Sequence, residues 1–330
     1  MEFSIVVPTR NRDEDLGELL HSILGQTILP IEVIVVDDSD NYRTKVLIEL
    51  MRKNFSNKGI ALKYMRGGEK GLAHARNVGA SQMTGTIYCG IDDDVILHKD
   101  YIEKILEVYK EYPDAVGVQG NTNFSKDFSV LKNAVNKVLF QPYFEKDSCR
   151  VRAAGMTLPR PLTRVIKSQW LSGTNSSYKR EVLKEDFKWD ENLRGYSLCE
   201  DMDISYRILE RHPHSLYTTP HARLFHKDSP VARIGTEKLI YMSVAYPTYF
   251  FFKNIKQTPL NMMIFVWSMF FGRFLAVLGK NRRSILFLIR AYLNLFKNFD
   301  EIKNGNFVYK PLPRRNSESG GAHTSVMRLS

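Results

Sequence analysis

The first forty residues, MEFSIVVPTRNRDEDLGELLHSILGQTILPIEVIVVDDSD (1–40), contain two short apolar runs on either side of an amphipathic segment. Residues 3–8 and 31–36 are rich in valine and isoleucine, which predicts two buried strands. Residues 13–24 carry apolar side chains at helical spacing and begin with acids, which predicts a helix. A strand, a helix and a strand in this order indicate two parallel strands joined by a crossover helix.

The alternation of strands and helices continues to about residue 120 and then loosens. It predicts an α/β fold with a mostly parallel sheet flanked by helices. We expect further strands over residues 61–65, 86–91 and 115–119, and further helices over residues 42–53, 72–82 and 99–112. Residues 121–167 are expected to be irregular. Beyond them we expect strands over residues 170–178 and 215–219 and helices over residues 180–184 and 200–211.

The last third of the chain has a different character. Residues 237–300 are strongly apolar and are expected to be helical, with a single charge, Arg273, between residues 262 and 279. A second apolar stretch, 285–296, is interrupted by Arg290. Both stretches fall short of the roughly 20 apolar residues that cross a bilayer, so we expect re-entrant or interfacial helices. Residues 311–330 are small and polar and are expected to be disordered.

Positive charge is concentrated in the same region. The chain has a formal net charge of +11, and 12 of its 47 Lys and Arg residues but only two of its 36 Asp and Glu residues lie between residues 253 and 315. A basic and apolar region is typical of contact with an anionic membrane surface, and we expect no nucleic-acid partner. Helix packing or dimerisation is the alternative.

The N-terminus and the cysteines bear on location. Met1 and Glu2 lead directly into the first strand, without the basic and long apolar segments of an export signal. Cys89, Cys149 and Cys199 are far apart and form no CxxC pair, which argues against a disulfide framework or a zinc site. We therefore expect a catalytic domain in a reducing, cytoplasmic environment.

Polar residues follow the first two predicted strands. Ligands of an open parallel sheet bind outside the carboxyl ends of its strands, and the first strand is followed by Pro8, Thr9 and Arg10. No GxGxxG motif is present there, which argues against a dinucleotide-binding fold. The second strand is followed by Asp37 and Asp38, which can accept hydrogen bonds from a base or ribose, or can cap the next helix.

Three adjacent carboxylates follow the strand predicted over residues 86–91. Asp92, Asp93 and Asp94 repel one another and are unfavourable for stability alone. A hard divalent cation such as Mg²⁺ or Mn²⁺ removes that cost, and it binds through one or two carboxylates together with diphosphate oxygens. The pattern therefore indicates a metal site, and a solvated acidic turn is the alternative.

Three further segments carry candidate functional residues. Arg76 lies on the third predicted helix and can reach a phosphate or the acidic site, while Gly79 permits close packing of that helix. Glu200 and Asp201 begin another predicted helix, where the helix dipole alone favours acids. Asp201 can also act as the general base for an acceptor hydroxyl. His226 can be a third metal ligand or a hydrogen-bond donor to a diphosphate, although a lone histidine is more often structural.

Together these segments resemble the family two glycosyltransferases of the GT-A fold. The resemblance covers about residues 1–230 and rests on short motifs in the expected order. They are Val6-Val7-Pro8-Thr9-Arg10-Asn11-Arg12, Val35-Val36-Asp37-Asp38-Ser39, Gly71 with Ala75-Arg76-Asn77-Val78-Gly79, Asp92-Asp93-Asp94, Gly173-Thr174-Asn175 and Glu200-Asp201-Met202-Asp203. Residues 37–40 read Asp-Asp-Ser-Asp where the family often has Asp-Asp-Gly-Ser.

The resemblance implies a role for each matching residue. Asp201 would be the catalytic base. Asp94, Asp92 and His226 would bind the metal, Mn²⁺ or Mg²⁺, and the donor sugar or acceptor would lie near Gly173. The substrate-binding residues that it implies are Pro8, Thr9, Arg10, Asp38, Arg76, Asp92, Asp93, Gly173, Asn175 and Glu200.

The expected protein is an inverting, metal-dependent hexosyltransferase. It would move a sugar from a nucleoside-diphosphate donor, UDP-linked by resemblance, to a hydroxyl of a glycan or polyprenyl-linked acceptor in the assembly of a cell-surface polysaccharide or a glycoprotein glycan. We expect a catalytic domain over residues 1–236, with a nucleotide-binding half (1–120) and an acceptor half (121–236). Residues 237–310 would associate with the cytoplasmic face of a membrane, peripherally or through short re-entrant or spanning helices.

Three rival interpretations are open. A nucleotide-sugar pyrophosphorylase would carry a glycine-rich loop after its first strand, which Pro8-Thr9-Arg10 does not provide. A non-catalytic membrane-associated protein with a degenerate transferase fold would not need Asp94 or Asp201. A retaining transferase would differ in the stereochemistry of its product.

Overall fold

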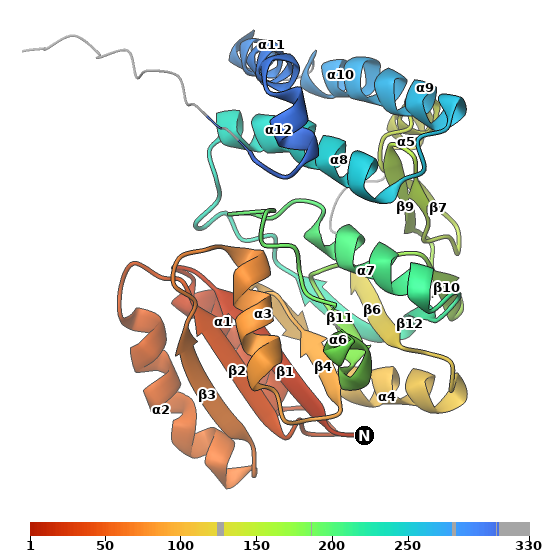
Figure 1. Cartoon of the computed structure of the whole chain (residues 1–330). Coiled ribbons are helices and arrows are strands. Elements are labelled where there is room, and N and C mark those ends of the chain that lie inside the picture. Colours follow the sequence, from red (N-terminus) through yellow and green to blue (C-terminus); the bar gives the residue numbers. More distant parts are fainter. Residues whose placement is uncertain (124–128, 186, 279–281, 308, 310–330) are drawn as a thin grey trace, which may run out of the picture.

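The computed structural model describes residues 1–123, 129–185, 187–278, 282–307 and 309. Within these residues, nine strands form one mixed sheet in the order β10-β12-β6-β11-β4-β1-β2-β3, with β5 paired to β12 (Figure 1). The strands are β1 (Phe3–Thr9), β2 (Glu32–Asp37), β3 (Ala61–Arg66), β4 (Ile87–Gly90), β5 (Val95–Leu97), β6 (Gly117–Asn123), β10 (Ile166–Ser168), β11 (Ser176–Lys179) and β12 (Leu216–His226).

The N-terminal strands have the predicted parallel arrangement. β1 pairs in parallel with β2 and β4, and β2 pairs in parallel with β3. β12 is parallel to β6, whereas β11 lies antiparallel between β4 and β6. The predicted α/β fold with a mostly parallel sheet is therefore confirmed. The carboxyl ends of β1, β2 and β4 meet at one edge of the sheet, which faces the layer of C-terminal helices in Figure 1.

Helices cover both faces of the sheet, and strands β1 and β2 contribute to two cores. Ile5 and Val7 join the core shared with α1, α2 and α4, while Val6 joins the core shared with α3, α6 and α7. Since both faces are buried, β1 and β2 are continuous apolar runs and not alternating ones. The helices are α1 (Asp13–Leu24), α2 (Arg43–Asn57), α3 (Leu72–Gln82), α4 (Tyr101–Glu111), α6 (Arg180–Lys184) and α7 (Glu200–Arg211).

Two glycines set the position of α3. A Cβ at Gly79 would lie 2.2 Å from Cγ1 of Val6, so the close helix packing predicted for Gly79 is confirmed. Gly71 precedes α3 with a φ of 102°, and a Cβ there would lie 2.5 Å from the backbone nitrogen of Gly195. This close approach joins the start of α3 to the loop before α7.

The middle of the chain differs from two expectations. Residues 130–168 are not irregular, because they form α5 (Val130–Val138), the edge strand β10 and a small sheet of β7 (Tyr143–Glu145), β8 (Val151–Arg152) and β9 (Gly155–Pro159). Strands of two to five residues show too little alternation to be recognised from sequence. The strand expected over 170–178 begins only at Ser176, since a turn closed by the bond from Asn175 N–H to the Ser172 carbonyl interrupts it.

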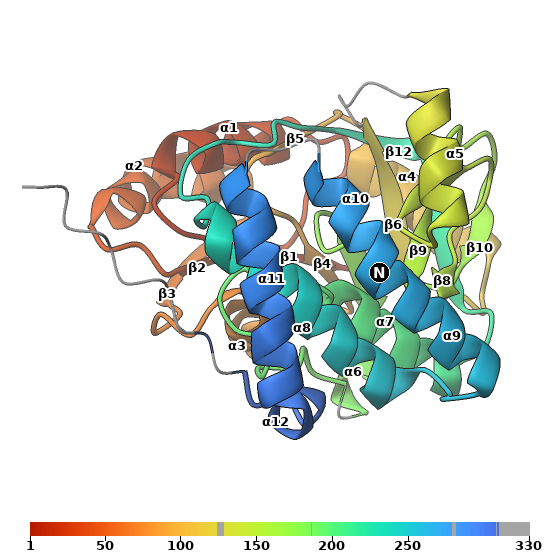
Figure 2. The same ribbon diagram turned by 90° about the horizontal axis from the view of Figure 1, so that it is seen from above.

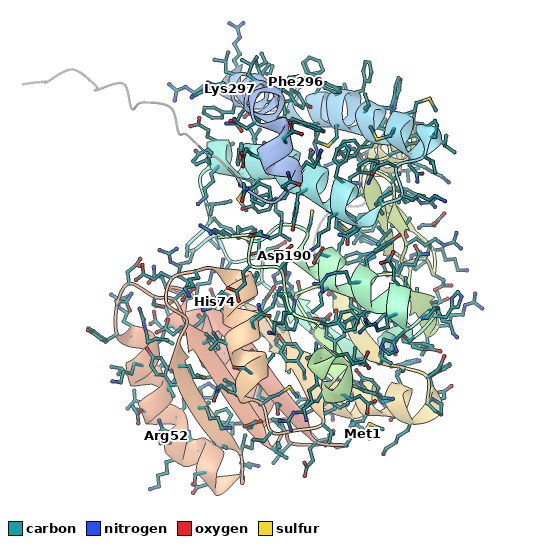
Figure 3. All side chains as sticks on the ribbon, viewed as in Figure 1. Met1, Arg52, His74, Asp190, Phe296 and Lys297 are labelled. Carbon is teal, nitrogen blue, oxygen red and sulfur yellow. The ribbon has the colours of Figure 1, made fainter. Side chains whose placement is uncertain are left out.

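The predicted C-terminal helices form a separate layer with its own core. They are α8 (Thr236–Asn254), α9 (Pro259–Trp267), the π-helical turn η1 (Ser268–Gly272), α10 (Arg273–Leu278), α11 (Arg282–Lys297) and α12 (Phe299–Lys303). α8 is buried between α7 and α11, and Figure 2 shows α11 beside the α9–α10 helix above it. Asp190 lies at the junction with the large sheet and its covering helices α1–α4, α6 and α7, which we call the catalytic body because it carries the candidate active site described below (Figure 3). Asp190 accepts the hydroxyl of Tyr249 at 2.5 Å and the ammonium of Lys253 at 2.6 Å.

The outer side of this layer is apolar. Among the described residues, one helix, Pro259–Leu278, is long and apolar enough to cross a membrane by length and composition. The residues predicted to be disordered, 311–330, lie outside the described residues. The exposed large apolar side chains of the outer face are Leu260, Met263, Val266, Trp267, Phe271, Phe274, Leu275, Leu278, Leu286, Ile289, Leu293 and Phe296.

Candidate active site

The three adjacent acids lie where β4 ends and β5 begins. Asp92, Asp93 and Asp94 follow β4, and β5 starts at Val95. β5 pairs antiparallel with the end of β12, and this register sets His226 opposite Val95. His226 therefore lies beside Asp94, although the two residues are 132 positions apart in sequence.

The three predicted metal ligands come together. One ligand atom each from Asp92, Asp94 and His226 lie within 4.8 Å of one another. Asp93 and Asp94 are buried, so the alternative of a solvated acidic turn is wrong. Two carboxylates and an imidazole suit a divalent transition metal such as Mn²⁺ better than Mg²⁺, which prefers an all-oxygen shell.

Asp94 is held by contacts from the end of β12 and from the segment that follows it. Its Oδ1 hydrogen-bonds Nε2 of His226 at 3.0 Å, and its Oδ2 accepts the backbone N–H of Ser229 at 2.9 Å. Burial acts to raise the pKa of Asp94, but His226 and Arg12 outweigh burial and lower it. The same contact raises the pKa of His226 against the effect of burial. A cation at this position would thus meet an ionised carboxylate.

Asp93 faces the first strand instead. It accepts the hydroxyl of Thr9 at 2.8 Å and the guanidinium of Arg12 at 2.9 Å. Burial raises the pKa of Asp93 to about 6, although both contacts oppose the shift. Arg12 also lies 3.5 Å from Asp94, so one cation partly neutralises two acids. Our sequence analysis gave Arg12 no role of its own. The three adjacent acids could have indicated it, because such a cluster requires a nearby positive charge.

Arg76 is the second cation of the centre. It is almost completely buried and donates to Asp92 Oδ1 at 3.0 Å, to the Gly173 carbonyl at 2.8 Å and to Glu200. Its Nε has no hydrogen-bond partner among the residues that the structure describes. The sequence predicted that Arg76 would reach either a phosphate or the acidic site. In the structure Arg76 contacts the acidic site, through Asp92. It therefore connects Asp92, one of the candidate metal ligands, to the start of α7.

Gly173 and Asp201 form the other side of this centre. A Cβ on Gly173 would lie 2.7 Å from both terminal nitrogens of Arg76 and 2.9 Å from Glu200, so a side chain there would have to displace this buried ion pair. Its N–H donates to Asp201 Oδ2 at 3.0 Å, and the Met202 N–H donates to Asp201 Oδ1 at 2.8 Å. Burial raises the pKa of Asp201, and these backbone donors oppose it. Each oxygen keeps a lone pair for the proton of a hydroxyl.

The residues expected to contact a nucleoside lie at the ends of β1 and β2. Asp38 is buried at the end of β2 and accepts the N–H of Glu69 at 2.9 Å. Neither Asp37 nor Asp38 caps α2, which the helix-capping alternative required. Pro8 and Thr9 are buried beside them, while the exposed Arg10 pairs with Asp40 at 3.3 Å.

Asn175 lies deeper than a substrate ligand would. It is 0% exposed, and neither atom of its side-chain amide has a hydrogen-bond partner within the described part of the chain. Its predicted contact with the donor sugar or acceptor stays a prediction.

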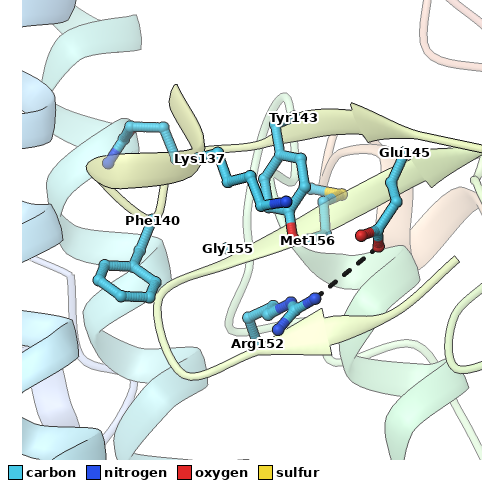
Figure 4. Close-up of a pocket in the computed structure, with 8 residues that line it drawn as sticks. Lys137, Phe140, Tyr143, Glu145, Arg152, Gly155 and Met156 are labelled. Atoms are coloured by element: carbon cyan, nitrogen blue, oxygen red, sulfur yellow. Dashed lines mark ion pairs between the residues drawn. The ribbon is translucent and has the colours of Figure 1, made fainter. Parts of the chain in front are cut away.

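Figure 4 shows a cavity of about 220 Å³ beside α5 and the small sheet, away from this centre. Tyr143 lies there between Lys137 and Arg152, each 5.8 Å from the centre of its ring, and Arg152 is 3.8 Å from Glu145. None of the predicted site residues lines this cavity. It therefore does not enlarge the candidate active site.

Comparison with known proteins adds independent information. Residues 4–187, more than half of the chain, match glycosyl transferase family 2. A glucosyl-dolichyl phosphate glucuronosyltransferase of Haloferax volcanii is 26% identical over 235 residues, which cover 69% of each protein. Other relatives are matched over a smaller part, as in 20% of the length of the glycosyltransferase GlyA of Streptococcus pneumoniae.

Solved structures support the fold. TarS residues 1-349 from S. aureus in complex with UDP-GlcNAc match with a TM-score of 0.55 at 16% identity, over 93% of this chain and 88% of that one. The mannosyltransferase PcManGT from Pyrobaculum calidifontis, in complex with GDP-Man and Mn²⁺, matches with a TM-score of 0.54 at 18% identity, over 92% and 84%. At these identities the likeness concerns the fold alone.

Proposed function

This chain belongs to glycosyl transferase family 2, and we propose that it is an inverting, metal-dependent hexosyltransferase that uses a nucleoside-diphosphate sugar. The observation that carries the proposal is the proximity of two groups. One is the candidate metal-binding group of Asp92, Asp94 and His226, and the other is the pair of acids, Glu200 and Asp201, at the start of α7. Arg76 connects them through Asp92 and Glu200. Two groups of this kind are needed at once, one for the leaving diphosphate and one for the attacking hydroxyl.

The donor side is organised by fixed charges. Asp92, Asp94 and His226 would hold Mn²⁺ or Mg²⁺, which neutralises the departing nucleoside diphosphate when it is bound. Arg12 lies next to Asp93 and Asp94 and limits their mutual repulsion. Asp38 and the end of β1 would accept hydrogen bonds from the nucleoside, and we expect uridine by family resemblance.

The acceptor side is organised by Asp201. The N–H groups of Gly173 and Met202 hold its carboxylate in one orientation. We propose that Asp201 takes the proton of an acceptor hydroxyl as that oxygen attacks the anomeric carbon opposite the leaving group. A single displacement from that side inverts the configuration of the sugar.

We propose a polyprenyl-linked glycan as the acceptor, at the cytoplasmic face of a membrane. The relative from Haloferax volcanii is named for a lipid-linked acceptor, glucosyl-dolichyl phosphate. The exposed apolar face of α9–α11 together with the positive charge of residues 253–315 supports peripheral membrane contact. We assign this contact to α9–α11 and not to all of residues 237–310, because α8 is buried against the catalytic body.

Calorimetry with nucleotides tests the donor site. We would titrate the purified protein with UDP, GDP and dTDP, with and without Mn²⁺, and repeat the titration on Asp94→Ala. We expect metal-dependent binding of one nucleotide, with its loss in the variant. Failure of every nucleotide to bind under any metal condition would contradict the proposed function.

Liposome flotation tests the membrane contact separately. We expect the full chain to float with vesicles that contain an anionic phospholipid and to float less with neutral vesicles or at high salt. A chain that binds nucleotide but does not float with anionic vesicles would refute the location while leaving the reaction intact.

A further inference from the structure

A second cavity, of about 370 Å³, lies between the loop that precedes α7, the first half of α8 and the segment that follows α12. α8 and α12 pack against each other, and Figure 1 shows them side by side. None of the predicted site residues lines this cavity, so the transfer reaction proposed above does not use it. Its volume falls within the range of about 300–1,000 Å³ that is usual for small-molecule sites.

Two glycines with left-handed backbone shape this cavity. Gly195, with a φ of 70°, belongs to the loop before α7, and its backbone forms a bridge with Gly71 at the start of α3. Gly305, with a φ of 85°, follows α12. A Cβ on Gly305 would lie 3.1 Å from Nδ2 of Asn192 and 3.2 Å from the ring of Tyr249. Both positions favour glycine, and the close approach of Gly305 brings the end of the C-terminal layer against the loop before α7.

The base of the cavity is aromatic. Tyr241 and Tyr246 are buried, and their ring centres lie 5.3 Å from that of Tyr309 and 4.4 Å from that of Phe307, respectively. The hydroxyl of Tyr246 donates to the carbonyl of Arg194 at 2.9 Å, which fixes this ring against the loop. Aromatic walls of this kind are typical of sites for small organic ligands.

The rim of the cavity is polar and positively charged. Lys238, Arg194, Asn192 and Asn306 line the cavity and are exposed. The Nζ of Lys238 lies 3.8 Å from the position of a Cβ on Gly195, so this ammonium lies over the loop. Within the described residues, neither Lys238 nor Arg194 forms an ion pair, and no Asp or Glu lines the cavity. The rim therefore presents two positive charges without a counter-charge.

The carboxylates next to this rim have other partners. Glu237, which precedes Lys238, pairs with Arg290 at 3.1 Å. Glu301 accepts the side-chain amide of Asn306 at 3.0 Å. Because neither acid is directed to the two cations, the local field attracts an anionic ligand.

We infer that this cavity binds an acidic sugar residue, an inference that rests on the transfer function proposed above. A sugar ring offers apolar faces to the aromatic base and hydroxyls to the amides of Asn192 and Asn306. Its carboxylate or phosphate group meets Lys238 and Arg194 with charge-assisted hydrogen bonds. The loop that bears Arg194 leads into α7, so a glycan bound here is held beside the segment that carries the proposed base.

Ligand-observed NMR titrations with glucuronic acid, glucose 6-phosphate and glucose test this inference. We expect at least one of the two anionic sugars to bind at least about ten-fold more tightly than glucose, since a hydrogen bond to a charged group is stronger than a neutral one. The two anionic probes separate a carboxylate from a phosphate. Excess UDP with Mn²⁺ should not displace them, and displacement would place the sugars in the donor site and overturn the inference.

Three variants assign the preference to the cavity. The double variant Lys238→Met with Arg194→Met changes two exposed side chains and should bind all three probes equally. Tyr309→Ser should weaken the binding of all three probes and keep the ratio between them. Lys256→Met is the matched control and should behave as the wild type, because Lys256 is also exposed but does not line the cavity.

A preference for anionic sugars that survives in the double variant, or that the wild type lacks, would overturn the inference. Inorganic phosphate that binds as tightly as the anionic sugars would do the same, because it would show an anion site without sugar recognition. Binding of UDP with Mn²⁺ is measured on the same samples. A wild type that binds UDP but no acidic sugar refutes this inference alone, whereas one that binds no nucleotide refutes the transfer function.

Discussion

At the scale of single residues, the site depends on how the backbone presents each carboxylate. Asp92, Asp93 and Asp94 are adjacent in sequence but have three different sets of partners, namely Arg76, the pair Thr9 and Arg12, and His226. Asp93 and Asp94 lie in the turn between β4 and β5, and this change of chain direction points neighbouring side chains to different partners. One acidic triplet can therefore serve both the metal site and the core of the fold.

The proposed base provides the first prediction. Asp201→Asn retains the shape and one of the two backbone hydrogen bonds, because its amide nitrogen cannot accept an N–H. It cannot take a proton, so we expect kcat to fall by about 10²–10⁴-fold. The Kd of the nucleotide with Mn²⁺ should be unchanged, because Asp201 lies outside the metal-ligating group. Steady-state kinetics and calorimetry on the same preparation measure both quantities. Equal losses of binding and of kcat would instead assign Asp201 to the donor site.

The pH dependence of the reaction provides the second prediction. Burial raises the pKa of Asp201, and the base acts only when it is ionised, so activity should be lost as the pH falls through this raised pKa. The limb should lie above the pKa of about 3.9 of an exposed aspartate. Protonation of His226 also weakens metal binding at low pH. Profiles of kcat against pH at increasing Mn²⁺ concentration separate protonation of Asp201 from loss of the metal. Only a limb that is caused by loss of the metal moves with the Mn²⁺ concentration.

Gly173 provides the third prediction. Gly173→Ala would force a methyl group against Arg76 and Glu200, so we expect a loss of stability of about 1–3 kcal/mol and a lower kcat. Gly235→Ala is the matched control, because nothing lies within 4 Å of a Cβ at that position. Thermal unfolding of both variants gives the comparison. A stable and fully active Gly173→Ala would contradict the tight contact with Arg76.

At the scale of elements, strand pairing decides where His226 lies. The antiparallel register of β12 with β5 sets His226 opposite Val95, and a slip of one residue would turn its ring to the other face of the sheet. The opposite end of the sheet is held by Glu32 at the start of β2. Glu32 accepts the hydroxyl of Ser4 at 2.6 Å and the N–H of Thr84 at 2.5 Å, and it pairs with Lys63.

Glu32 provides the fourth prediction. Burial acts to raise the pKa of Glu32, but Lys63, Ser4 and Thr84 outweigh burial and lower it from 4.5 to about 2. A lowered pKa stabilises the fold above the unfolded value and loses this effect as the pH falls through the folded value. We expect Glu32→Gln to lower the free energy of unfolding at pH 7 by up to about 3 kcal/mol.

The deficit of Glu32→Gln should shrink between about pH 4.5 and pH 2, which denaturant unfolding at several pH values measures. Glu49→Gln, which removes an exposed carboxylate, should show a much smaller effect. A deficit that is the same at all pH values would mean that Glu32 contributes through packing and not through its charge.

At the scale of the whole molecule, the apolar outer face of α9–α11 sets the fifth prediction. Leu286, Leu293 and Phe296 on α11 are 58%, 62% and 63% exposed. An apolar patch of this kind marks an interaction surface. Replacing all three by serine should abolish flotation with anionic vesicles and lower Tm only slightly, since the three side chains are mainly exposed and the ring of Phe296 stacks on Phe270 with the ring centres 5.9 Å apart. The double replacement of Val46 and Leu50, which are exposed on α2, should leave flotation unchanged.

Local patterns in the sequence were sufficient to predict the order of the strands and helices. They were also sufficient to predict that acidic residues lie at the carboxyl ends of the strands. Strands and helices along residues 1–120 follow from apolar periodicity, because a fully buried strand or an amphipathic helix shows its environment in its own residues. The prediction placed Asp92, Asp94 and His226 in one metal site, and the structure brings them together. The short strands β7, β8 and β9 escaped prediction because two to five residues carry no clear period.

Only the tertiary structure decided what each functional side chain meets. Arg12 and Asp93 are 81 residues apart, Arg76 and Glu200 are 124 apart, and His226 and Asp94 are 132 apart. Such contacts depend on sheet order and register, which no local pattern contains. The same reason applies to Arg273, which the sequence shows as an interruption of an apolar helix. Its partial burial follows from the packing of the C-terminal helices, because packing alone decides which side of a helix faces inward.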